Sequence, residues 1–370
     1  MSNERNYDTE RLPDTNSSNL GENLDRRNFL KTAAGGSAAV AMTLAGTVGS
    51  AGAAENLHAR VPAEDLPVDE NIGDLEAVAS FNQQVVGVAV SASGRVFVSF
   101  PRNGIDTVKK SVAEVIDGKA VVYPNREINT LDTRAPSTHF LSVQSVYVDA
   151  NDTLWCLDVG NLGSGTALVP GGAKLVAIDL TTNTVTRTIV FPASLITKGT
   201  SINDVRFDSQ RGKAGFAYIS DSSAAAGSGI IVVDLSTGKA VRRLANDPTV
   251  LPDPAFRATV EGKPFVIQAT VDAAPSLVSV AADGIAVSAD GKLVYYCPIA
   301  SRNLYSVDAA VLTDFTQSDA AVAATIKNLG DKGWLGSGRA GARLSDERGV
   351  QRHPAVRSVA GNGGHFQPDV

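Results

Sequence analysis

The chain has 370 residues, of which 43% are hydrophobic and 19% are charged, and its formal net charge at pH 7 is −6. This length and apolar content suffice for one large buried core or two ordinary ones. The acidic balance and the absence of a basic stripe argue against nucleic-acid binding, because phosphate contacts require clustered Lys and Arg.

Residues 1–54 have the layout of an export signal. Residues 1–24 are polar and poor in large apolar side chains, which is typical of a disordered leader. The twin-arginine signature follows, with Arg26, Arg27, Phe29 and Leu30. A weakly apolar stretch rich in Ala and Gly then leads to a small-x-small cleavage pattern. A membrane anchor or a disordered tail is the alternative, but this stretch has too few large apolar residues for a stable span. We therefore expect export by the twin-arginine translocase and a periplasmic or extracellular mature chain.

Residues 55–80 contain Pro and acidic residues without a sustained period, and they predict a leading loop. From residue 81 onward, one hairpin phrase occurs four times, as two β-rich runs around a tight polar turn. Its copies lie at 87–100, 145–158, 204–221 and 284–299. The second and third copies are each followed by another hairpin, at 174–191 and 229–244, so that one unit has four strands.

Units of four antiparallel strands predict an all-β fold and, if arranged radially, a β-propeller over residues 81–332. A β-sandwich is the alternative, although it does not require a repeated four-strand phrase. The fourth copy comes late, which indicates an insertion within 246–264. Another strand is expected at 264–271, and a short helix at 308–319.

Residues 333–370 differ in composition and hydrophobic pattern from the rest of the chain. They contain five Arg, no Lys and eight Gly, and they show no alternation of apolar residues. Two interpretations stay open: an irregular natural tail, or loss of the reading frame near residue 333. Either interpretation leaves the last blade of the propeller incomplete.

Candidate site residues come from aligning the repeats. The positions immediately before the inner strand of each unit are Val86, Gln144, Asn203 and Asp283. Innermost strands surround the axis of a propeller, so Gln144, Asn203, Asp283 and the neighbouring Asp204 should converge on its channel. Carboxylate and amide oxygens suit Ca²⁺, which makes Asn203 and Asp283 candidate metal ligands. The alternative is that these side chains only cap strand ends.

Other polar residues give less support for chemistry. The four His residues form neither a catalytic triad nor a metal-ligand cluster. Asp149, Asp208 and Asp290 fall in hairpin turns, where Asp is expected for structural reasons. Trp155 falls in a strand and is expected in the core.

Three stretches resemble the major royal jelly protein/yellow family: residues 142–160 (SVQSVYVDANDTLWCLDVG), 201–244 (SINDVRFDS…YISDSS…GIIVVDLSTG) and 284–312 (GIAVSADGKLVYYCPIASRNLYSVDAAVL). The resemblance implies a six-bladed propeller, a secreted location and a small organic ligand in the central channel.

A more distant similarity is to the gluconolactonase/regucalcin propellers, which hold one divalent cation with a Glu, two Asn and an Asp. Asn203 and Asp283 match that set, whereas Val86 stands where the Glu would lie, and the last-blade acid has no match in 333–370. The sequence thus leaves three hypotheses: an exported propeller that binds a small organic molecule, a Ca²⁺-dependent hydrolase of sugar lactones, or an inactive truncated product.

Overall fold

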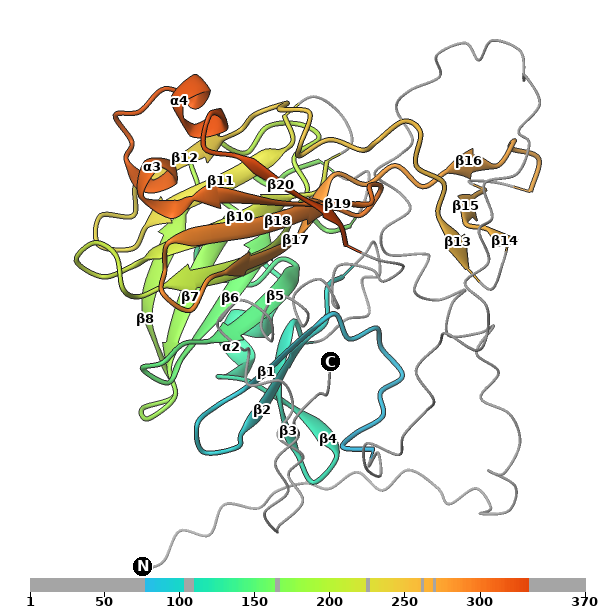
Figure 1. Ribbon diagram of the computed structural model, residues 1–370. Helices are drawn as coiled ribbons and strands as arrows, with labels where there is room; N and C mark the ends of the chain where they lie inside the picture. Colours follow the sequence, from blue (N-terminus) through green and yellow to red (C-terminus); the bar gives the residue numbers. More distant parts are fainter. Residues whose placement is uncertain are drawn as a thin grey trace, which may run out of the picture.

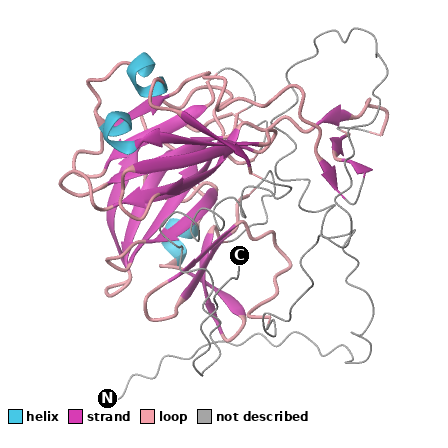
Figure 2. Cartoon of the chain, viewed as in Figure 1, coloured by secondary structure: helices cyan, strands magenta, loops and turns pink. Residues whose placement is uncertain are grey.

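The computed structural model describes residues 77–102, 110–163, 167–223, 227–260, 263–268 and 271–332. These residues form an all-β protein with three short helices at its periphery (Figure 2). The export signal with Arg26, Arg27, Phe29 and Leu30, and the segment 333–370, lie outside the described residues.

Four antiparallel sheets of four strands each make up the body of the described protein, and in each sheet the strands follow chain order. Sheet 1 comprises β1 (Gly87–Val90), β2 (Val96–Ser99), β3 (Val112–Ile116) and β4 (Lys119–Val122). Sheet 2 comprises β5 (Val143–Val148), β6 (Thr153–Val159), β7 (Ala173–Asp179) and β8 (Thr184–Val190). Sheet 3 comprises β9 (Ile202–Asp208), β10 (Phe216–Asp221), β11 (Gly229–Asp234) and β12 (Ala240–Arg243). Sheet 4 comprises β17 (Ala282–Val287), β18 (Leu293–Pro298), β19 (Asn303–Asp308) and β20 (Lys327–Asp331).

The first strand of each sheet is its inner strand, and consecutive inner strands lie side by side: β1 with β5, β5 with β9, and β9 with β17. Figure 1 shows sheet 1 at the bottom, sheet 2 above it, and sheets 3 and 4 overlapping in the upper part of the view. This arrangement confirms the four-strand unit and the propeller architecture expected from the repeat. The described residues form four such units, and the count of six blades stays a prediction.

The hydrophobic core lies between neighbouring sheets. Phe97 of sheet 1 packs in one cluster with Leu154 and Ile178 of sheet 2. A second cluster joins sheets 2 and 3 through Trp155 and Phe207, and a third joins sheets 3 and 4. Each sheet therefore buries its apolar faces against its neighbours and has no separate core.

Turn chemistry explains why the sequence folds into hairpins at these points. Asn183 (φ 55°) and Gly238 (φ 77°) occupy the left-handed region in the turns between the third and fourth strands of sheets 2 and 3, as hairpin turns require. Asp149, in the first turn of sheet 2, accepts hydrogen bonds from the backbone N–H groups of Asn151 and Thr153. These contacts agree with the structural role expected for the turn aspartates.

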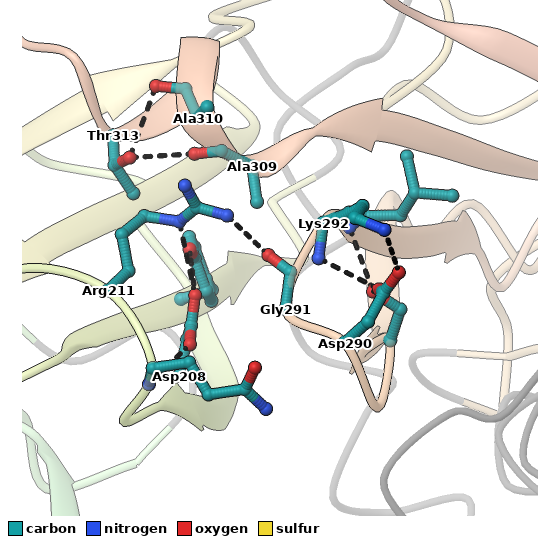
Figure 3. Close-up of polar contacts among 12 residues, drawn as sticks. Asp208, Arg211, Asp290, Gly291, Lys292, Ala309, Ala310 and Thr313 are labelled. Carbon is teal, nitrogen blue, oxygen red and sulfur yellow. Dashed lines mark hydrogen bonds and ion pairs between the residues drawn. The ribbon is translucent and has the colours of Figure 1, made fainter.

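The turns at the outer ends of the inner hairpins also connect successive sheets. Figure 3 shows the connection between sheets 3 and 4, where Arg211 Nη2 donates to the carbonyl oxygen of Gly291 at 2.5 Å. Arg211 also pairs with Asp208 (Nε to Oδ2, 3.3 Å), and Asp208 receives the backbone N–H of Gln210. Asp290 pairs with the exposed Lys292 in the neighbouring turn (2.9 Å).

Several expected elements differ from those observed. Strands β3 and β20 were not anticipated, nor was helix α2 (Arg126–Asn129). The expected helix over 308–319 is replaced by two shorter ones, α3 (Ala309–Thr313) and α4 (Asp319–Ala323), which Asp308 and Ser318 cap with their side chains.

The single strand expected at 264–271 was wrong, because this region forms two-residue ladders. They are β13 (Thr259–Val260) with β14 (Lys263–Pro264), and β15 (Val266–Ile267) with β16 (Ser276–Leu277). Most of their described side chains are exposed, and these strands lie away from the four sheets (Figure 1). The insertion therefore extends well beyond residue 264.

Candidate functional site

The three predicted site positions lie at irregularities of the inner strands. In sheet 2, Val143 pairs with Asp158 and Ser145 with Leu157, so Gln144 is an extra residue that forms a β-bulge. In sheet 4, Asp283 is extra in the same way between Ala282 and Gly284. In sheet 3, the register shifts between Ile202 and Val205, which places the irregularity at Asn203 and Asp204. Bulges re-aim side chains and are common next to functional sites.

The structure brings these side chains into one hydrogen-bonded chain across three sheets. Gln144 Nε2 donates to Asn203 Oδ1 at 3.0 Å, and Asn203 Nδ2 donates to Asp283 Oδ2. The hydroxyl of Ser222 lies 3.1 Å from the same carboxylate oxygen of Asp283. Gln144, Asn203 and Asp283 are all partly exposed. These three hydrogen-bonded side chains therefore face solvent where the inner strands meet.

A second polar group lies one residue further along the strands. Ser145 Oγ donates to Asp204 Oδ1 at 2.7 Å, and Arg206 Nη1 pairs with Asp204 Oδ2 at 2.8 Å. Burial opposes the charge of Asp204, but Arg206 and the hydrogen bonds from Ser145 and Val205 outweigh that effect and lower the pKa of its carboxyl. Asp204 is therefore an ionised carboxylate with its counter-charge built in.

Asp283 behaves in the opposite way. Burial, reinforced by repulsion from Asp204, raises the pKa of its carboxyl to about 6. The hydrogen bonds from Ser222 and Asn203, and the charge of Lys332, oppose this rise without cancelling it. A carboxyl with a pKa raised toward neutrality, on a partly exposed surface such as the one that Asp283 shares with Gln144 and Asn203, is typical of functional sites.

Sheet 1 does not contribute an equivalent polar side chain. Its inner strand has no bulge, because Gly87 pairs directly with Ser99 and the ladder continues regularly to Val90. Val86 is 40% exposed. A Cβ atom at Gly87 would lie 2.7 Å from Ser99 Oγ and 3.0 Å from the backbone nitrogen of Val146, so glycine permits the close approach of sheets 1 and 2.

Two buried aspartates hold the site and were not anticipated. Asp158 is fully buried and accepts hydrogen bonds from the backbone N–H groups of Leu141 (2.7 Å) and Ser142 (3.0 Å), which directly precede β5. Asp221 likewise accepts the backbone N–H of Ser201, just before β9. We call Asp158 and Asp221 the clamp aspartates. The sequence signal for them was the Asp that ends the second β-rich run in the second and third copies of the phrase.

The clamp aspartates are neutralised by basic side chains from outer strands. Lys174 Nζ lies 2.7 Å from Asp158 Oδ2, and neither side chain is exposed. Arg242 Nη1 lies 2.6 Å from Asp221 Oδ2. The positions of Gln144 and Asn203 thus depend on buried ion pairs a few residues away in the same sheets.

The donor set offers limited support for a divalent cation. Asn203 turns its amide nitrogen toward Asp283, as a direct hydrogen bond requires, whereas a shared cation would need the amide oxygen there. Within the described ranges, no group of three or more His, Cys, Asp or Glu residues is arranged to hold a metal ion. Ca²⁺ bound by Asn203 and Asp283 stays a prediction.

Trp155 is only 7% exposed and packs against Phe207 in a tilted arrangement, with 5.0 Å between ring centroids. Its indole Nε1 donates to Asp149 Oδ2 at 2.9 Å. This placement in the core between sheets 2 and 3 is the one expected from the sequence.

Comparison with known proteins identifies the class to which this propeller belongs. The sequence model described as Major royal jelly protein matches residues 141–351, more than half of the chain. The chain belongs to the major royal jelly protein family. A second match, to the twin-arginine translocation signal sequence, covers residues 23–43 and confirms the export signal. Among the described residues, no helix has the length and hydropathy needed to cross a membrane.

Two curated relatives lie in the same family. The chain is 25% identical over 239 residues to major royal jelly protein 1 of Apis mellifera, and 28% identical over 234 residues to protein yellow of Drosophila madeirensis. Each match covers 61% of this chain, but only 50% and 39% of the respective relatives. The chain therefore spans half or less of the length of these relatives.

Solved structures with a partial likeness include hydrazine synthase of Kuenenia stuttgartiensis (12% identity, TM-score 0.39, 65% of this chain and 57% of that one). A gluconolactonase of Xanthomonas campestris is also similar (12% identity, TM-score 0.34, 60% and 71%). At these scores the likeness carries no argument about activity.

Proposed function

We propose that this protein is an exported propeller that binds a small organic molecule where its inner strands meet, through Gln144, Asn203, Asp204 and Asp283. The observation that carries the proposal is the hydrogen-bonded chain from Gln144 through Asn203 to Asp283, in which each member comes from a different sheet. A role confined to capping strand ends would need contacts within one sheet only.

The wall formed by these residues has the chemistry of a ligand site. Amide, carboxylate and hydroxyl groups converge on a partly exposed surface, and the buried clamp aspartates hold the strand ends that carry Gln144 and Asn203. Small-molecule sites combine a rigid apolar scaffold with a few convergent polar groups of this kind. Family membership supports the same function.

Thermal unfolding of the purified mature protein with amines, catechols and sugar lactones tests the proposal. At least one class should raise the melting temperature, because ligand in excess over Kd stabilises the state that binds it, by about 2.7 kcal/mol at a hundredfold excess. Asn203→Ala should abolish that shift, since it breaks the chain at its centre.

Asn151→Ala is the matched control, because Asn151 is exposed in a turn at the other end of the strands and should leave the shift unchanged. Failure of all three ligand classes to stabilise the protein would contradict the proposal. Repeating the lactone arm with EDTA, while following lactone hydrolysis, separates simple binding from the Ca²⁺-dependent hydrolase.

A further inference from the structure

One basic residue breaks the pattern of the repeats. In sheets 2 and 3, a basic side chain reaches the end of the second strand and meets a clamp aspartate there: Lys174 meets Asp158, and Arg242 meets Asp221. In sheet 4, Lys332 takes the corresponding place. Its ammonium donates to the carbonyl oxygen of Pro298 at 2.5 Å, and the residue is only 7% exposed.

The register shows that sheet 4 lacks the clamp aspartate. Asp158 pairs with Val143, and Asp221 pairs with Ile202. The corresponding pair in sheet 4 joins Ala282 to Pro298, so proline stands where the acid should be. A buried ammonium without a counter-charge costs several kcal/mol.

In sheet 4 the acidic residue lies at the neighbouring bulge instead, at Asp283. Sheets 2 and 3 carry neutral amides there, Gln144 and Asn203, whereas sheet 4 carries Asp283, directly after Ala282. Lys332 favours the ionised form of Asp283. The neighbouring Cys297 adds no charge, because burial raises the pKa of its thiol.

We propose that Lys332 is the counter-charge of Asp283, and that the resulting balance of charge makes the site selective for uncharged, hydrogen-bonding ligands. Arg206 forms an ion pair with Asp204, and the charge of Lys332, held at the carbonyl oxygen of Pro298, would balance that of Asp283. Gln144, Asn203 and Ser222 complete a wall of donors and acceptors without net charge. Lys332 is a positioning residue, because it acts through Asp283. The selectivity for uncharged ligands rests on the proposed binding function, whereas the pairing of Lys332 with Asp283 does not.

A double-mutant cycle tests the pairing without a ligand. At pH 7.5, Lys332→Met should lower the melting temperature when Asp283 is present, because the ionised carboxylate of Asp283 loses its counter-charge. In an Asp283→Asn background the same change should lower the melting temperature at least about 2 °C less, because the effects of two coupled groups do not add. Lys332→Arg keeps the charge and should recover most of the loss.

Lys174→Met provides the matched control, because Lys174 is tied to Asp158 in sheet 2 and its effect should add to that of Asp283→Asn. Equal losses from Lys332→Met in both backgrounds would reduce Lys332 to a packing role and overturn the pairing.

Thermal shifts with matched probes test the ligand class: 2-phenylethanol against 2-phenylethylamine, and glucose against glucosamine. The uncharged member should stabilise the wild-type protein at least as well as its ammonium analogue. Lys332→Met should reverse that preference, because it leaves the charge of Asp283 unbalanced. Stabilisation by the ammonium members alone would refute the ligand class. If neither pair binds, the ligand class fails for lack of a binding site, while the melting cycle still decides the role of Lys332.

Discussion

Asp283 carries its carboxylate at a point where the fold disfavours the charge. Burial and the nearby Asp204 raise the pKa of this carboxyl to about 6, from an ordinary value of 3.8. The folded protein therefore holds a proton on Asp283 between about pH 4 and pH 6, where the unfolded chain has already released it. Because the native state binds more protons in this window, stability falls as pH rises through it.

Asp283→Asn should remove this loss. A shift of about two pKa units corresponds to about 3 kcal/mol for a fully buried group, and we expect about half of that because Asp283 is partly exposed. Between pH 4 and pH 7.5 the melting temperature of the wild type should therefore fall by a few degrees relative to that of Asp283→Asn.

Scanning calorimetry at several pH values measures the difference. Asp117→Asn is the control, because Asp117 lies exposed in a turn of sheet 1 at φ 48°, a conformation that asparagine also adopts. Parallel pH profiles for wild type and Asp283→Asn would show that Asp283 does not titrate in this window.

The sequence predicted which site residues converge, but not how they bond. The repeated phrase placed Gln144, Asn203 and Asp283 at equivalent positions, and equivalence in a radial repeat is enough to bring them together. Whether Gln144 or Asn203 donates in each hydrogen bond depends on side-chain rotations, which the spacing of residues in the sequence does not specify. The role proposed for Lys332 could not be predicted from the sequence either. It depends on the strand register of sheet 4, in which Pro298 occupies the position of a clamp aspartate.

At the scale of strands, prediction succeeded where the local pattern and the tertiary environment agree. Strand β7 (Ala173–Asp179) is buried through most of its length and apolar enough to be recognised. Strand β20 has the sequence Lys-Asn-Leu-Gly-Asp, which has low β propensity, and it becomes a strand by pairing with β19. Strand β3 contains Ala and Glu, and the Asp117–Gly118 turn that follows was its strongest signal.

The clamp aspartates show how one side chain fixes the start of an element. Asp158 accepts hydrogen bonds from Leu141, Ser142 and Gly160 and pairs with Lys174, all without solvent exposure of the ion pair. Asp158→Asn keeps the shape but leaves the ammonium of Lys174 without its counter-charge. We expect a loss of about 3–5 kcal/mol in the free energy of unfolding, as for other broken buried pairs.

Urea denaturation measures this loss, and Asp290→Asn is the comparison, because Asp290 pairs with Lys292 in an exposed turn. The exposed variant should change stability far less. Asp158→Asn should also weaken any ligand-dependent shift, since Gln144 follows the clamped residues directly. Similar stabilities for the two variants would mean that solvent or a rearranged backbone compensates the buried lysine.

The three large core clusters each span two neighbouring sheets, so the described sheets depend on one another to bury their apolar faces. A sheet released from its neighbours would expose the apolar face that they cover. Export after folding therefore suits this architecture, and the twin-arginine route carries folded proteins. The match to the twin-arginine signal at 23–43 contains Arg26 and Arg27.

Replacing Arg26 and Arg27 with lysine should prevent export and leave a folded precursor inside the cell. Lysine keeps the charge but lacks the planar guanidinium, so the pair is not interchangeable in specific recognition. Cell fractionation with immunoblotting measures the distribution, and protease resistance of the retained chain reports its folding. Arg5→Lys with Arg11→Lys is the control, because both residues precede the matched signal and should leave export unchanged. Export of the Arg26→Lys, Arg27→Lys variant at the wild-type level would show that a different route carries the protein. A retained chain that proteases degrade rapidly would show instead that the sheets do not assemble before translocation.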